Sequence, residues 1–210
     1  MGKGWLKKTW DFIWHSNSVL SWIVNVILAF VIVKFLIMPG LGLAFDTEFP
    51  VVVVMSGSME HDTEEYCLPN GQCFDNYICG ENLIEDESLS LDRFWEVCGK
   101  VYTEYNITKE EFSEFRFDGG FDKGDLMFII GKDSYEVGDV LVFQGSRSDP
   151  IIHRLVLVEE GYTTRGDHNN GIRSDEVNIS SDRIFGKAYF RIPYVGWLKI
   201  GVMKLFGMDV

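Results

Sequence analysis

The apolar stretch at residues 19–38 constrains this chain most, because its twenty residues contain a single charge, Lys34. About 20 consecutive apolar residues are enough to cross the hydrocarbon core of a bilayer as a helix. Lys34 lies near the far end, where its amine can reach the membrane interface. The sequence therefore predicts a transmembrane helix over residues 19–38.

The residues before this stretch predict its orientation. Residues 1–18 contain three lysines and one acidic residue, namely Lys3, Lys7, Lys8 and Asp11. Positive flanks stay on the cytoplasmic side, so we expect a cytoplasmic N-terminus and an extracytoplasmic remainder. A cleavable signal peptide would have a shorter apolar core and a small-x-small site, which residues 39–44 do not supply. We therefore expect an uncleaved, single-pass anchor.

The length and net charge of the whole chain limit the class of protein that it can be. A chain of 210 residues can hold one domain with a core and a segment or two outside it. The formal net charge of −13 would repel phosphates, which argues against a nucleic-acid partner. We place one extracytoplasmic domain at residues 45–193.

Short apolar runs separated by Gly-Asp and similar turns dominate the second half of the chain. They lie at residues 126–130, 140–143, 151–158, 161–164 and 186–192. Another run, the valines at residues 51–54, is followed by Met55 and then by Ser-Gly-Ser at residues 56–58. This pattern is typical of a mainly β domain.

Residues 62–122 differ from this pattern and form an acidic, loop-like insertion, with short helices expected near residues 91–98 and 109–115. The insertion contains all four cysteines of the chain, Cys67, Cys73, Cys79 and Cys98. Clustered extracytoplasmic cysteines predict two disulfides, whose pairing the sequence leaves open among three arrangements. No C-x2-C pair is present, which argues against zinc.

Ser58 and His153 are the candidates for chemistry. A serine at a tight turn after a buried strand is held rigidly, but its hydroxyl needs an adjacent base to become a nucleophile. A histidine with a pKa near ~6.5 can supply that base. Asp167 and Asp175 both compete to orient the imidazole. The plainer interpretation is an ordinary turn serine and a structural histidine. The histidines lack metal-binding spacing, so we expect no metal and no other cofactor.

Five motifs then occur in a recognisable order. They are SGSME at residues 56–60, GDVLVF at 138–143, PIIHR at 150–154, TRGDHNN at 164–170, and the segment 186–196. Together they resemble type I signal peptidase, of the archaeal and endoplasmic-reticulum kind that uses a Ser-His pair. The resemblance implies a signal-peptidase-like β fold with an N-terminal transmembrane helix. It does not cover the insertion.

The resemblance also implies roles for individual residues. Ser58 matches the nucleophile and His153 the general base, while the Ser56 hydroxyl matches a group that helps the Ser58 N–H hold the oxyanion. Asp175 best matches the essential aspartate of the family, and Asp167 matches the aspartate of the TRGDHNN motif. The Asp167-to-Asp175 spacing is longer than in the family, and His61 stands where the family commonly has proline.

The function implied is that of signal peptidase I, a membrane-bound serine endopeptidase that removes signal peptides after small residues. Its partners would be preproteins, the lipid bilayer and signal peptidase complex subunits. The expected location is the cell membrane, with the endoplasmic-reticulum membrane and a lumenal catalytic domain as the alternative. Two other functions stay open: a non-catalytic membrane-anchored binding module, and a peptidase of the same fold for specialised precursors.

The C-terminal segment at residues 194–210 is apolar, contains Lys199 and Lys204, and is shorter than a full membrane span. We expect a helix lying in the membrane interface with its lysines toward the headgroups. A short second transmembrane segment and a core helix are the alternatives.

Overall fold

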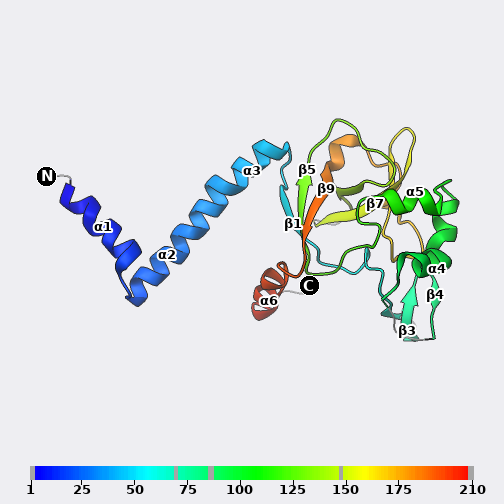
Figure 1. Cartoon of the computed structure of the whole chain (residues 1–210), viewed down its shortest axis with the longest axis horizontal. Coiled ribbons are helices and arrows are strands. Elements are labelled where there is room, and N and C mark those ends of the chain that lie inside the picture. Colours follow the sequence, from blue (N-terminus) through cyan, green and yellow to red (C-terminus); the bar gives the residue numbers. More distant parts are fainter. Residues whose placement is uncertain (1–2, 69–70, 85–87, 147–148, 208–210) are drawn as a thin grey trace. The chain divides into compact units, whose positions relative to one another are not determined.

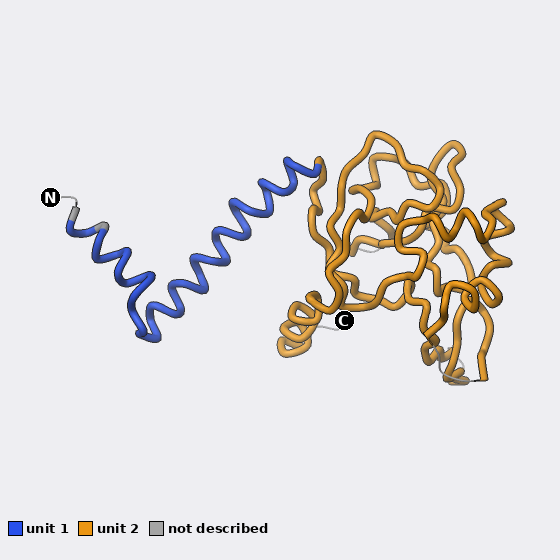
Figure 2. The backbone as a smooth tube through the Cα atoms, in the orientation of Figure 1, with its two compact units in different colours: residues 1–45 blue, residues 46–210 orange. Residues whose placement is uncertain are grey.

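The computed structural model describes residues 3–68, 71–84, 88–146 and 149–207. The chain divides into two compact units, residues 1–45 and residues 46–210 (Figure 2). The first unit contains the predicted membrane segment, and the second contains the candidate chemistry.

The described part of the first unit is helical except for residues 16–18. It comprises α1 (Lys3–His15), α2 (Val19–Ile32), the π-helical η1 (Val33–Ile37) and α3 (Met38–Phe45) (Figure 1). Ser18 caps the start of α2 by accepting a hydrogen bond from the Ser21 N–H, as helix-starting serines commonly do. Among the described residues, Val19–Phe45 is the one helix long and apolar enough to cross a membrane, with a mean hydropathy of 2.5.

This helix continues past the end predicted at Met38. Pro39 lies inside it, although proline lacks an N–H and its ring crowds the carbonyl four residues before it. The wide π-helical turn Val33–Ile37 ends two residues before Pro39. Such a turn breaks the regular hydrogen-bond ladder locally, and this lets the helix pass the proline and end at Phe45.

The second unit is built on a six-stranded antiparallel sheet with the strand order β1-β5-β9-β6-β7-β8. The prediction of a mainly β domain is confirmed at this level. The strands are β1 (Val51–Val53), β5 (Leu126–Ile130), β6 (Val140–Gln144), β7 (Pro150–Val158), β8 (Tyr162–Arg165) and β9 (Ile184–Ile192).

The hydrophobic core under this sheet fixes the segment that carries Ser58. Along β5, Met127 and Ile129 are buried in alternation with half-buried neighbours, as the two-residue period of a strand requires. They pack in one cluster with Val54 and Met59. Because both ends of the segment between Val54 and Met59 are anchored in the core, Ser58 has a defined position.

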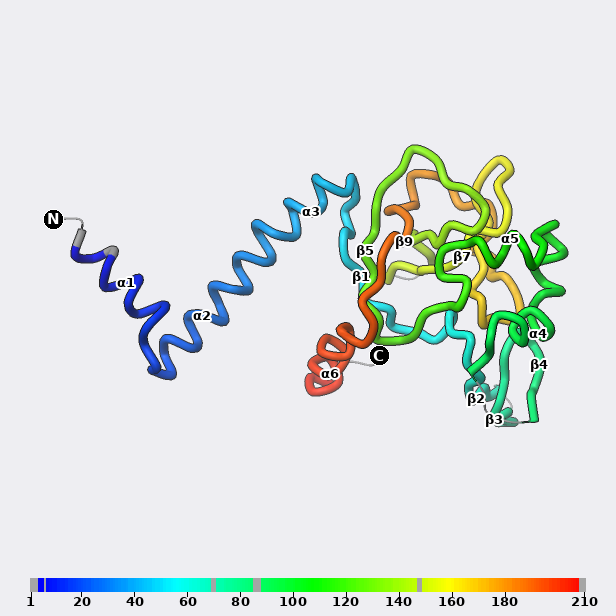
Figure 3. Tube along the Cα trace, viewed as in Figure 1, coloured from blue at the N-terminus to red at the C-terminus, as the bar shows by residue number. Residues whose placement is uncertain are grey.

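The insertion contains more regular structure than the sequence predicted. The two expected helices are present as α4 (Leu91–Thr103) and α5 (Lys109–Glu114), and Thr108 with Glu111 forms a capping box at the start of α5. A second sheet of β2 (Glu64–Cys67), β3 (Cys73–Ile78) and β4 (Glu81–Asn82) lies beside α4 (Figure 3). The loop-like prediction was wrong here. The strands β2 and β4 are exposed and lack an apolar alternation, so they carry no local strand signal.

The four cysteines form two disulfides, as predicted. Cys67–Cys73 closes the β2–β3 hairpin, and Cys79–Cys98 joins the residue after β3 to α4. Cys98 is buried in a second core together with Tyr102 and Val156. Since Val156 belongs to β7, the insertion packs directly on the main sheet.

The chain ends in α6 (Trp197–Leu205), which buries Ile200 and exposes the large apolar side chains of Leu198, Leu205 and Phe206. These features fit the predicted interfacial helix, which stays a prediction. Residues 208–210 of the predicted segment lie outside the described residues.

Candidate active site

Ser58 lies in a tight turn that follows β1. Gly57 precedes it, and a Cβ atom built on Gly57 would collide with the carboxyl group of Glu64 from β2. A larger residue at this position would therefore displace the Glu64 carboxyl group from the turn. Ser58 itself is half-buried, whereas the next residue, Met59, is fully buried in the core.

The sheet brings His153 to Ser58 across 95 residues of sequence. Its Nε2 atom lies 2.9 Å from the Ser58 Oγ atom, which is hydrogen-bonding distance. His153 sits in the middle of β7, opposite Leu141 of β6, and is only 5% exposed. This arrangement is the one that a serine nucleophile and its general base require.

The second imidazole nitrogen of His153 meets Glu176. The Nδ1 atom is hydrogen-bonded to Glu176 Oε1, and the Glu176 side chain is fully buried. The other carboxylate oxygen, Oε2, accepts a hydrogen bond of 2.7 Å from the Arg173 backbone N–H. This contact orients the carboxylate in the 3-10 turn Ser174–Glu176. Ser58, His153 and Glu176 thus form a continuous hydrogen-bonded line.

Asp175, the neighbour of Glu176, lies elsewhere. Its Oδ2 atom accepts a 2.9 Å hydrogen bond from the Ser146 backbone N–H and forms a 3.2 Å ion pair with Arg173. The Ser146 hydrogen bond is the main reason that the pKa of Asp175 is lowered. The sequence predicted Asp175 or Asp167 beside His153, whereas the structure places Glu176 there.

Asp167 is buried in a separate polar cluster behind the Ser-His pair. It forms a 2.6 Å ion pair with the fully buried Arg154 and accepts a 2.8 Å hydrogen bond from the Tyr102 hydroxyl. His61 Nε2 lies 3.2 Å from its other oxygen. Burial would raise the pKa of Asp167, but the Arg154 charge and the hydrogen bonds with His61 and Arg154 hold it well below its usual range.

The turn that holds Asp167 touches the backbone of Ser58. The His168 N–H donates a 3.0 Å hydrogen bond to the Ser58 carbonyl oxygen. A Cβ atom on Gly166 would lie 2.7 Å from that oxygen and 2.9 Å from His153 Nε2. Gly166 is therefore needed for the turn to pass this close to the Ser-His pair.

Two further groups lie near Ser58. The Ser56 Oγ atom is exposed and lies 3.3 Å from the Ser58 Oγ atom.

Burial and a hydrogen bond with Glu64 raise the pKa of Glu60 to about 7, although the hydrogen bond from the Lys123 N–H opposes this shift. Glu60 can therefore be protonated near neutral pH.

One group in the described chain has the spacing of metal ligands, and it comprises Glu65, Cys67 and Cys73. Its two sulfur atoms are joined in a disulfide, so neither is a thiolate that could bind zinc. The residues present therefore do not fit a metal site.

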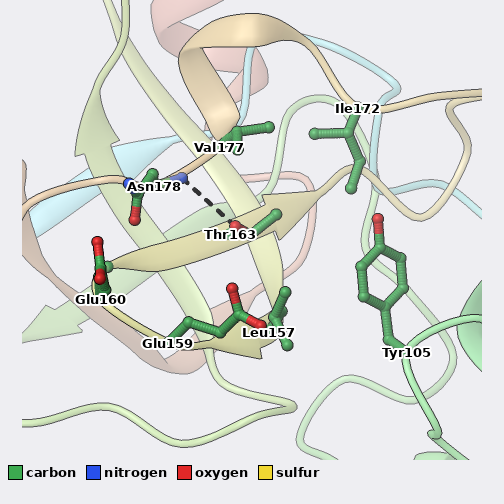
Figure 4. Close-up of a pocket in the computed structure, with 9 residues that line it drawn as sticks. Tyr105, Leu157, Glu159, Glu160, Thr163, Ile172, Val177 and Asn178 are labelled. Atoms are coloured by element: carbon green, nitrogen blue, oxygen red, sulfur yellow. Dashed lines mark hydrogen bonds between the residues drawn. The ribbon is translucent and has the colours of Figure 1, made fainter.

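A cavity of about 580 Å³ lies apart from the Ser-His pair, and Ser58, His153 and Glu176 are not among its lining residues (Figure 4). Apolar side chains and two carboxylates surround it, from Tyr105, Leu157, Glu159, Glu160, Ile172 and Val177. The close-up shows Asn178 and Thr163 joined across its rim by a 3.4 Å hydrogen bond. The candidate chemistry is therefore not in this cavity.

Sequence reasoning missed Glu176. The segment Ser174-Asp175-Glu176 offers two adjacent carboxylates, and the sequence alone does not show which of them turns toward His153. The two carboxylates differ in burial, since Glu176 is fully buried and Asp175 is less so. That difference becomes visible only once the turn has folded.

Comparison with known proteins identifies relatives of the chain. No protein-family model matches it. The signal peptidase complex catalytic subunit SEC11 of Colletotrichum graminicola is 30% identical over 116 residues, covering 43% of this chain and 66% of that protein. The human catalytic subunit SEC11C is 31% identical over 94 residues, covering 38% and 49%. The Dictyostelium discoideum catalytic subunit sec11 is 32% identical over 93 residues, covering 38% and 52%.

The chain therefore spans between about half and 66% of the length of these relatives. All three are catalytic subunits of a signal peptidase complex, in agreement with the order of motifs in the sequence. The chain is homologous to the SEC11 catalytic subunits of signal peptidase complexes.

Proposed function

We propose that this protein is a membrane-bound serine endopeptidase that removes signal peptides from preproteins. The observation that carries the proposal is the hydrogen-bonded line from Ser58 through His153 to the buried Glu176. The names of the relatives supply the substrate class, and the apolar helix Val19–Phe45 supplies the attachment to a membrane.

In the proposed mechanism, His153 Nε2 takes the proton of the Ser58 hydroxyl as the oxygen attacks the scissile carbonyl carbon. Glu176 accepts a hydrogen bond from the Nδ1–H of His153 and stabilises the imidazolium that forms. The imidazolium then protonates the leaving amine, which departs as the N-terminus of the mature protein. A water molecule, deprotonated by His153, attacks the acyl-enzyme and releases the signal peptide with a free carboxylate.

The Ser58 N–H and the Ser56 hydroxyl are proposed to bind the oxyanion. The 3.3 Å distance between the two serine oxygens puts the Ser56 hydroxyl within reach of an oxygen that develops on the attacked carbonyl. One such donor typically lowers the barrier by ~3 kcal/mol.

The carboxylates divide into separate roles in this proposal. Glu176 is the acid that orients His153. Asp175 accepts the Ser146 N–H and stabilises the turn that carries Glu176. Asp167 pairs with Arg154 and supports the turn against Ser58.

The membrane and the partners follow from the relatives and are part of the proposal. We infer that the chain works with other signal peptidase complex subunits, because the relatives are named as subunits of that complex. The expectation of the cell membrane finds no support in these relatives. The proposal is therefore limited to a membrane-anchored enzyme that acts on signal-peptide-bearing preproteins.

Cleavage of a preprotein tests the proposal. The full chain is reconstituted in liposomes with a preprotein, and mass spectrometry locates the cut, with Ser58→Ala and His153→Ala as variants. We expect one cut after a small-x-small site by the wild type and none by either variant. Cleavage by Ser58→Ala, or no cleavage by the wild type in the presence of its complex partners, would overturn the proposal.

A further inference from the structure

The insertion encloses an ion pair that lies directly behind the candidate active site. Arg154 and Asp167 are both fully buried. Arg154 follows His153 in β7, and successive residues of a strand point to opposite faces. One face therefore presents His153 to Ser58, and the other presents Arg154 to the insertion.

Most of the groups that surround Arg154 belong to the insertion. The guanidinium donates hydrogen bonds of 3.1 Å to the Arg116 carbonyl and 2.7 Å to the Phe117 carbonyl. It also lies over the Phe112 ring, 4.9 Å from the centroid. A buried charge pair is stable only if its remaining hydrogen-bonding groups are satisfied. Here two carbonyls of the insertion accept from the guanidinium, and the Gly138 carbonyl of the main domain accepts a further 3.3 Å hydrogen bond.

The Asp167 carboxylate is likewise held from the insertion side. The Tyr102 hydroxyl of α4 donates a 2.8 Å bond to it, and His61 Nε2 lies 3.2 Å away. Burial is the main reason that the pKa of Tyr102 is raised well above its usual value, so its hydroxyl stays protonated as a donor. His61 stacks on Phe94 of α4 with 3.6 Å between ring centroids.

A third link joins the insertion to the backbone of the same turn. The Cys79 N–H donates a 2.9 Å hydrogen bond to the His168 carbonyl, and the His168 N–H bonds to the Ser58 carbonyl. Cys79 is fixed to α4 by its disulfide with Cys98. The turn is thus held on one side by the insertion and bonded on the other to Ser58.

We infer that the insertion, residues 62–122, together with His61, is a brace for the active site, and that Tyr102 and His61 are positioning residues. They hold the Asp167 carboxylate in place and so fix the turn at residues 166–168. This turn is bonded to the Ser58 backbone, and it thereby keeps the Ser58 hydroxyl at hydrogen-bonding distance from His153. The inference deepens the proposed function and rests on it. It also assigns a role to His61, which stands where the family resemblance led us to expect proline.

The experiment compares Tyr102→Phe with Tyr105→Phe in the full membrane-reconstituted chain. Both substitutions remove one hydroxyl from the same segment, but Tyr105 borders the separate cavity. The readouts are kcat and KM on a preprotein, and amide hydrogen exchange of residues 165–169. Because one hydrogen bond to a charged group is lost, we expect Tyr102→Phe to lower kcat about tenfold with KM unchanged. We also expect faster exchange in that turn and no effect of Tyr105→Phe.

A second variant guards against simple loss of folding. His61→Phe keeps the stacking on Phe94 but deletes the bond to Asp167, so the fold is retained and the same two readouts should change. Unchanged kcat and unchanged exchange in both variants would overturn the brace, as would an exchange increase spread evenly over the sheet. Absence of cleavage in the wild type would count against the proposed function alone, because hydrogen exchange still tests the brace.

Discussion

Replacing Glu176 by glutamine is the sharpest test of the assignment of the third group. The substitution keeps the size of the side chain and removes its charge. Glu176 is fully buried and bonded to His153 Nδ1. A glutamine amide there can donate to Nδ1, which forces the imidazole proton onto Nε2, so that Nε2 no longer accepts the Ser58 proton.

The expected magnitude follows from the loss of both the correct tautomer and the stabilised imidazolium. The corresponding change in serine proteases lowers kcat by about 10⁴-fold, or roughly 5.5 kcal/mol of barrier. We expect a loss of about 10³- to 10⁴-fold in kcat for Glu176→Gln, with KM little changed. The assay is single-turnover cleavage of a preprotein in liposomes.

Asp175→Asn is the matched control, since it removes one negative charge from the adjacent position. Asparagine still offers an oxygen to the Ser146 N–H, so activity should stay within about threefold of the wild type. The family resemblance selected Asp175 as the essential acid. A collapse of kcat in Asp175→Asn together with an active Glu176→Gln would refute the reasoning from the structure.

Three other predictions follow. Replacing Cys79 and Cys98 by serine should lower the free energy of unfolding by about 3 kcal/mol, measured by urea denaturation, because their sequence separation is 19 residues; an unchanged midpoint would contradict this. Gly166→Ala should lower kcat by about 100-fold, since its Cβ would lie 2.7 Å from the Ser58 carbonyl, whereas Gly171→Ala, with nothing within 4 Å, should have wild-type activity. The pKa of Glu60 is raised from 4.5 to about 7, so its contribution to stability is complete below pH 4.5 and is lost as the pH rises to 7. Between pH 4.5 and pH 7, the Tm of Glu60→Gln should therefore fall less than the Tm of the wild type. An equal fall in Tm for both proteins would count against the raised pKa.

The main sheet could be predicted because each of its strands carries a local signal. Runs such as Leu126–Ile130 and Val140–Gln144 are largely apolar and bounded by turns, and the valine strand before Ser58, which is half-buried, is equally plain. The order of motifs likewise pointed to Ser58 and His153, which the fold brings together. These signals are local sequence patterns, so they can be recognised without knowledge of the tertiary structure.

The features that the sequence did not reveal depend on tertiary contacts. The β2–β3–β4 sheet has exposed outer strands, and its first hairpin is closed by the Cys67–Cys73 disulfide. The choice of Glu176 over Asp175 depends on the direction of a single 3-10 turn. The continuation of the apolar helix through Pro39 depends on a π-helical turn, and no local pattern of residues in the sequence predicts such a turn.

The insertion illustrates the same limit in a functional setting. Its composition suggested an acidic loop region, yet it supplies Tyr102 and the Arg116 and Phe117 carbonyls to the Arg154–Asp167 pair. These contacts join residues that are far apart in the chain, and each donor and acceptor is ordinary when considered alone. Only the folded arrangement shows that the insertion borders the active site.

Trapping the covalent intermediate tests the central claim most directly. The full chain in liposomes is mixed with a preprotein and quenched in acid within the first turnover, and mass spectrometry then maps any adduct. We expect the signal peptide to be attached through an ester to Ser58, and we expect His153→Ala and Glu176→Gln to accumulate little or none of this adduct. An adduct on another residue, or full cleavage by Ser58→Ala, would rule out Ser58 as the nucleophile.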